Sequence, residues 1–183
     1  MQKKPLTIHH SPFTLKGASC FLLPIAIGMA SCFFSCSFNP SLQGKGKAAI
    51  QGTWQQDSLA NSKQLVNYAL YRFRFSCDSV FIRMENFSKV NYGADTCMRN
   101  GHWFEYARAT YAQSHDTLRI NGYYCNADYT LKDTKGCFNS GPYAESFKIS
   151  PKGDSVLQMQ PLSGTLPFKL RLIKRTSCVP KPL

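Results

Sequence analysis

From residue 48 onward, apolar and polar residues alternate with a period of two, which is typical of strands that bury one face. The alternation is clearest over residues 71–76, 80–85, 117–121 and 168–172. No long stretch has a helical period, and residues 58–68 hold at most one short helix. We expect eight strands, at residues 49–56, 68–76, 79–87, 101–112, 117–124, 143–150, 155–160 and 167–175. The domain is therefore predicted to be all-β.

An aspartate followed by serine or threonine and an apolar residue recurs at Asp78, Asp116 and Asp154, each 38 residues after the last. Aspartate accepts backbone N–H groups that a chain reversal leaves free, so each motif predicts a tight hairpin. Alternate connections then lie at opposite ends, one closed by short turns and the other ringed by long loops. We expect an eight-stranded antiparallel up-and-down β-barrel, whose interior is either filled by side chains or holds one small ligand.

The first residues read as an export signal. Lysines at positions 3, 4 and 16 precede an uncharged segment whose strongly apolar part, residues 20–34, is too short for a membrane span. Cys32 follows two small residues, as lipoprotein signal peptidase requires, and Cys36 is the alternative lipidation site. We expect a lipoprotein signal peptide at 1–31 (to 35 if Cys36 is lipidated), an anchor and linker at 32–47, and the barrel at 48–183. A plain secretory leader with unmodified cysteines remains open.

The length of 183 residues suits one domain. The charge composition indicates which partners to expect. Lysine and arginine number 22 against 10 acidic residues, a net charge of +12, and removal of residues 1–31 leaves +9. Such a surface attracts anionic lipid headgroups. The basic residues are scattered, and an exported protein seldom meets nucleic acid, so we expect no nucleic-acid partner. The expected location is the cell envelope, anchored to a membrane by a lipid such as palmitate, with the outer membrane favoured.

Eight cysteines in an exported chain indicate disulfides, and the absence of any Cys-x-x-Cys argues against a metal site. Cys77 lies at the first tight turn, and the last strand returns Cys178 to the same end of the barrel, so we predict a Cys77–Cys178 bond. Cys97, Cys125 and Cys137 are expected in the long loops of the open end. Two of them should pair there, and the third is left free or pairs with Cys36.

Residues 48–175 resemble the lipocalin-like fold in four features. These are the motif Gly52-Thr53-Trp54 on the first strand, the eight strands, the alternation of short and long loops, and a last strand that ends in Lys174-Arg175. The resemblance implies structural roles for Gly52, Trp54 and Arg175, with the Trp and Arg side chains stacked across the closed end.

The whole chain is also similar to a group of small Gram-negative envelope lipoproteins, through residues 36–40 and 87–97. Some members carry the name fumarate hydratase. The Gly-Ser-Ser-x-Met-Pro loop of one fumarase class is absent here, and the iron–sulfur class needs a much longer chain. We therefore expect no enzyme, and an unrecognised hydratase is kept as an alternative of last rank.

No catalytic motif, metal site or cofactor is expected, but the predicted open-end loops are rich in aromatic residues. Candidate binding residues are Tyr92, His102, Trp103, Tyr124 and Tyr129. Aromatic rings around a barrel mouth suit an apolar ligand or a glycan. The alternative is that these rings only form a small hydrophobic core for the disulfide-linked loops.

The leading prediction is a lipoprotein that binds a small apolar ligand or an envelope component in the barrel or at its rim. The alternative is a protein-binding module, such as a hydrolase inhibitor, and an envelope enzyme ranks third. A hollow interior would favour the carrier, a filled one loop-mediated binding, and a polar cleft catalysis.

Overall fold

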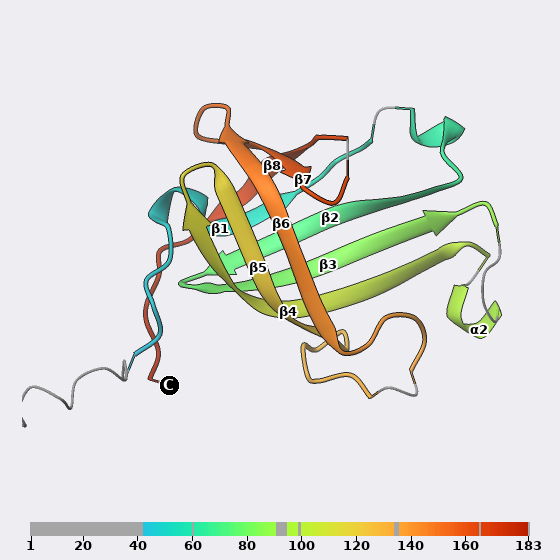
Figure 1. The fold of residues 1–183 in the computed structure, drawn as a ribbon, viewed down its shortest axis with the longest axis horizontal. Coiled ribbons are helices and arrows are strands. Elements are labelled where there is room, and N and C mark those ends of the chain that lie inside the picture. The colour runs from blue at the N-terminus through green and yellow to red at the C-terminus, as the bar shows by residue number, and fades with distance from the viewer. Residues whose placement is uncertain are drawn as a thin grey trace, which may run out of the picture. The chain divides into compact units, whose positions relative to one another are not determined.

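Eight antiparallel strands form one sheet that closes into a barrel (Figure 1). The strands are β1 (Gly52–Gln55), β2 (Asn67–Ser76), β3 (Ser79–Ser88), β4 (His102–Ser114), β5 (Thr117–Cys125), β6 (Pro142–Pro151), β7 (Val156–Pro161) and β8 (Phe168–Arg175). Each pairs with the next, and β8 pairs back with β1. The computed structural model describes residues 42–59, 61–90, 95–98, 100–133, 136–164 and 166–182. The predicted all-β, up-and-down barrel is confirmed.

The three predicted hairpins join β2 to β3, β4 to β5 and β6 to β7. In each, the residue just before the aspartate adopts a left-handed conformation: φ is 56° at Cys77, 53° at His115 and 73° at Gly153. Residues with positive φ are what tight hairpin turns require. The aspartates therefore mark the turns, and the residues that precede them provide the reversal.

One strand boundary was wrong: the first strand begins at Gly52, because residues Ala48–Ile50 form a 3-10 helix, η2, that leads into the barrel. The one short helix that residues 58–68 were said to hold at most is a 3-10 turn, η3 (Ser62–Gln64). A short helix that the sequence did not predict, α2 (Asp95–Met98), lies between β3 and β4. No helix among the described residues is long and apolar enough to cross a membrane.

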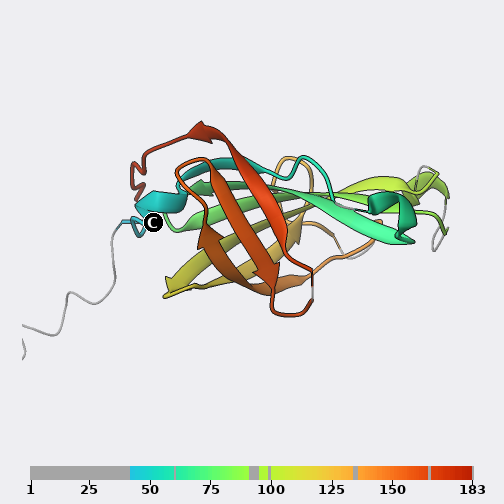
Figure 2. The same ribbon diagram turned by 90° about the horizontal axis from the view of Figure 1, so that it is seen from above.

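Side chains fill the interior of the barrel. Alternate residues of each strand point inward, and Phe73, Ile82, Leu118 and Leu170 have no accessible surface at all. If a void large enough for a water molecule lay beside one of these side chains, part of that side chain's surface would be accessible. Stacked and edge-on aromatic pairs run through this core. In Figure 2, β6 to β8 (orange to red) cross β2 and β3 (green), and the core lies between these two sets of strands. The interior is therefore a packed core.

Buried hydrogen bonds seal the closed end, where the three hairpin turns lie. The Gln51 amide accepts a hydrogen bond from the Cys77 backbone N–H at 2.8 Å and donates one to the Cys77 carbonyl at 2.7 Å. The same amide donates to the Tyr111 hydroxyl at 2.8 Å. Gln51 is only 2% exposed, so these bonds replace water for the whole amide group. This side chain thus ties the entry of β1 to the first hairpin.

Two further contacts at the closed end were predicted. Cys77 and Cys178 form a disulfide with their Cα atoms 4.7 Å apart, across 101 residues of chain. The Arg175 guanidinium lies 5.5 Å from the centroid of the buried Trp54 ring, and it donates to the carbonyls of Ala49 and Asp154. Both contacts fix the end of β8 and the tail beyond it to the closed end.

Replacing Gln51 by leucine is expected to lower the free energy of unfolding by about 2 kcal/mol, because the buried Cys77 N–H loses its acceptor. Urea denaturation with the disulfides intact measures this. Gln64→Leu, at an exposed position of η3, is the matched control and should change stability little. Equal effects of the two substitutions would contradict the role given to Gln51.

Candidate functional site

Strands β2, β3 and β4 run beyond the barrel at its open end (Figure 1). The β2–β3 pairing continues to Asn67 opposite Ser88, whereas β1 pairs with β2 only as far as Arg72. On the other side, β5 pairs with β4 only as far as Tyr106. Residues 67–71, 84–88 and 102–105 therefore form a three-stranded sheet, here called the extension. The β1–β2 and β3–β4 connections, two of the long loops that the sequence predicted, join it.

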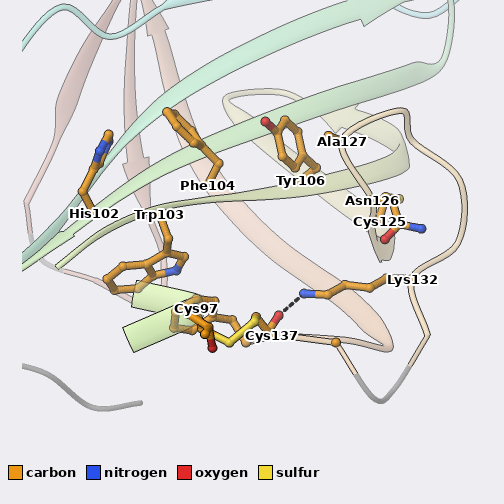
Figure 3. A pocket seen from close by; sticks show the side chains of 13 residues that line it. Cys97, His102, Trp103, Phe104, Tyr106, Cys125, Asn126, Ala127, Lys132 and Cys137 are labelled. Carbon is orange, nitrogen blue, oxygen red and sulfur yellow. Dashed lines mark hydrogen bonds between the residues drawn. A yellow bond between two sulfur atoms is a disulfide. The ribbon is translucent and has the colours of Figure 1, made fainter. Parts of the chain in front are cut away.

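A pocket of about 410 Å³ lies where α2 and the β5–β6 connection meet the start of β4 (Figure 3). The disulfide Cys97–Cys137 forms part of its wall and joins α2 to that connection, with Cα atoms 5.5 Å apart. This is one of the pairings that the sequence left open. The Lys132 ammonium donates to the carbonyls of Cys137 and Asn139, so the connection is tied internally as well. The disulfide and the Lys132 hydrogen bonds therefore fix the wall of the pocket.

Trp103 provides the largest ring in the pocket wall. It stacks on Phe138 with ring centroids 4.5 Å apart, and Figure 3 shows it directed toward the disulfide. Its indole Nε1–H is buried and has no hydrogen-bond partner among the described residues. A buried donor without an acceptor is costly, so an acceptor oxygen that reached this N–H would be stabilising.

His102, the residue before Trp103, points to the opposite face of β4, because successive strand side chains alternate (Figure 3). Its ring stacks on Phe87 at 4.7 Å, and its Nε2 lies 3.0 Å from a carboxylate oxygen of Glu85. These contacts hold the imidazole at the margin of the pocket.

The aromatic candidates do not form a single rim. Trp103 and His102 line the pocket, but Tyr124 faces the barrel interior, 5.4 Å from the ring of Tyr143. The alternation of β5 explains this, since Tyr124 has the same parity as the buried Leu118. Tyr129 lies on the outer face of the sheet, 5.1 Å from the ring of Phe81, because a left-handed backbone (φ 64°) turns it back. Tyr92 lies outside the described residues, as do Cys32 and Cys36.

Cys125 was expected in a loop, but it is the last residue of β5 and is buried. Its pairing with Tyr106 in the sheet holds it away from the other two open-end cysteines, which bond to each other. Its thiol is free, and burial raises the pKa of this thiol above the usual value. The side chain therefore stays a neutral thiol near neutral pH and is a poor nucleophile there.

Glu105 is the buried acid of the open end, 7% exposed, and its contacts are structural. One carboxylate oxygen accepts the Asn139 N–H at 3.0 Å and the other accepts the Asn86 amide at 3.3 Å. Burial, reinforced by Glu105 and Glu145, raises the pKa of the nearby Tyr124 hydroxyl. Within the described ranges, no cluster of three or more His, Cys, Asp or Glu residues is arranged to hold a metal ion.

Comparison with known proteins finds no matching family model, no matching curated protein and no matching solved structure. The two resemblances noted for the sequence therefore stay predictions. Sequence reasoning missed Lys132, and a single lysine in an irregular connection gives no signal that would have singled it out.

We expect the Cys125 thiol of residues 37–183 to be unreactive toward a disulfide reagent while the domain is folded, and to react once concentrated guanidinium exposes it. Its burial and raised pKa both lower the accessible thiolate. Cys125→Ala is the control and should titrate no thiol under either condition. Titration of more than one thiol in denatured, unreduced protein would contradict the two disulfides.

Proposed function

We propose that this protein is a lipid-anchored binding protein of the cell envelope that takes its ligand at the pocket of the open end rather than inside the barrel. The packed core carries the proposal: aromatic and aliphatic side chains occupy the interior where a lipid or other apolar cargo would sit. The pocket beside Trp103, in contrast, is open and within the size range of small-molecule sites.

The chemistry of the pocket favours a glycan or another ligand with an apolar face and oxygen acceptors. Trp103 and Phe138 supply ring surface, and Asn126 and Lys132 supply polar groups along the wall. Aromatic rings with a few polar groups recognise molecules of this kind with little loss of side-chain entropy. An acceptor oxygen of the ligand that reached the Trp103 Nε1–H would satisfy a donor that has no partner among the described residues. The disulfide frame keeps these groups in place before binding.

A protein partner is the second candidate, and the outer face of the extension favours it. Tyr68, Phe87 and His102 stack in series there, and Phe104 beside them is 40% exposed. A row of partly exposed rings is a feature of protein interfaces. Catalysis ranks third, because no set of reactive side chains converges in the described pocket.

A glycan array probed with residues 37–183 is expected to give ligands whose binding falls at least about tenfold in Trp103→Ala, since that change removes the main ring surface. Tyr123→Ala is the control, because Tyr123 is exposed and lies outside this pocket.

Native mass spectrometry of residues 37–183 should show the polypeptide mass alone. A reproducible extra mass that disappears on denaturation would mean a carrier and would contradict the proposal.

Metabolic labelling with a palmitate analogue tests the anchor. The label should enter the wild-type chain and Cys36→Ser and be lost in Cys32→Ser, because Ala30 and Ser31 leave room for the peptidase at Cys32. Loss only in Cys36→Ser would move the lipid to the alternative site. Labelling of neither wild type nor variants would contradict lipidation.

A further inference from the structure

A second hollow, of about 300 Å³, lies on the outer face of the barrel over β1, β2 and β3. Three arginines line it, and it shares no residue with the pocket of the open end. Its lining residues are Thr53, Arg72, Arg74, Phe81, Arg83 and Tyr129. The strand pairing brings them together, since Arg72 is directly opposite Arg83 and Arg74 is directly opposite Phe81.

The described residues balance only part of the positive charge of this hollow. Arg83 bonds to Glu85 at 3.2 Å, but the ion pairs formed among the described residues include neither Arg72 nor Arg74. Like charges placed directly opposite each other on neighbouring strands destabilise a sheet. Three guanidinium groups and the Glu85 carboxylate leave a net charge of about +2, so the repulsion between Arg72 and Arg83 is only partly offset.

Aromatic rings hold part of the cluster in a fixed geometry. The Arg74 guanidinium lies 3.9 Å from the centroid of the Phe81 ring, so one of its flat faces is covered. Its N–H groups form no hydrogen bond to an acceptor among the described residues. Tyr129 meets the same ring edge-on and closes the hollow from the β5–β6 connection. Burial raises the pKa of the Tyr129 hydroxyl, whereas Arg74, Arg83 and Arg72 act to lower it, so all three cations lie near this group.

We propose that the hollow bounded by Arg72, Arg74 and Arg83 binds the phosphate group of a phosphomonoester. A phosphomonoester carries a charge of about −1.5 to −2 and three acceptor oxygens, which matches the unbalanced charge and the free guanidinium donors. Phe81 and Tyr129 offer ring surface to the group that bears the phosphate. The phosphate comes either from a soluble molecule or from a lipid headgroup, and this site does not depend on the glycan site proposed above.

The test uses residues 37–183, which contain the compact unit Ser41–Leu183. Calorimetric titration at low salt with phenyl phosphate should show one saturable site. Arg72→Gln and Arg74→Gln should each weaken it about tenfold or more, because each removes charged hydrogen bonds. Arg119→Gln removes the same charge from an exposed position of β5 outside the hollow, so it should bind like the wild type. Equal weakening by all three variants, or no saturable binding by the wild-type protein, would overturn the proposal.

Sedimentation with vesicles separates the two sources of phosphate. Phosphatidylcholine vesicles containing phosphatidic acid should pull down the wild type and Arg119→Gln, but not Arg72→Gln or Arg74→Gln, if the site takes a lipid headgroup. Binding of phenyl phosphate with no such vesicle binding assigns the site to a soluble phosphomonoester. The absence of both overturns the proposal.

Thermal unfolding without ligand provides a check on the folding of the variants. Arg72→Gln should melt at a higher temperature than the wild type, because it removes the like-charge contact with Arg83. A lower melting temperature would make Arg72 a structural residue and would overturn its assignment as a ligand contact.

Discussion

Closure of the ring by β1 is the constraint on which the rest of the structure depends. This strand has only four residues, yet it pairs with β2 on one side and β8 on the other. The approach to β8 is so close that a Cβ atom at Gly52, where φ is 133°, would lie 2.4 Å from the Lys174 carbonyl oxygen. Without this closure, β2 and β8 would be open edges. The Gln51 hydrogen bonds and the Cys77–Cys178 disulfide hold the same end together.

Large inward side chains pack the interior of this eight-stranded ring, and for that reason both proposed binding sites are placed outside it. On β2, Phe73 and Phe75 fill the interior while Arg72 and Arg74 alternate with them on the outside. The same strands therefore supply both the core and the charged outer surface. The pocket beside Trp103 and the arginine hollow both lie outside the core, over a scaffold that packing makes rigid.

Much of the fold could be predicted from the sequence, because strand alternation and tight turns are local signals. The Asp78 turn also implied the β2–β3 register, which sets Arg72 opposite Arg83, so part of the arginine hollow was accessible from the sequence. Of the pocket at the open end, the sequence indicated Trp103 and His102 but not the wall that encloses them. Three open-end cysteines allow several pairings, and the left-handed turn at Tyr129 has no sequence signal that separates it from other loop positions.

The two faces of the extension show why the aromatic residues of the open end divide between separate roles. Trp103 and His102 are neighbours in sequence, but strand alternation sends Trp103 toward Phe138 and the stapled loops, and His102 toward Phe87 on the other face. A cluster that is continuous along the chain thus becomes two surfaces. The face with Trp103 forms most of the pocket proposed for a small molecule, and the face with Phe87 presents the row of rings proposed for a protein partner. Both faces rest on the same stretch of β4, so the two proposed sites share one supporting strand.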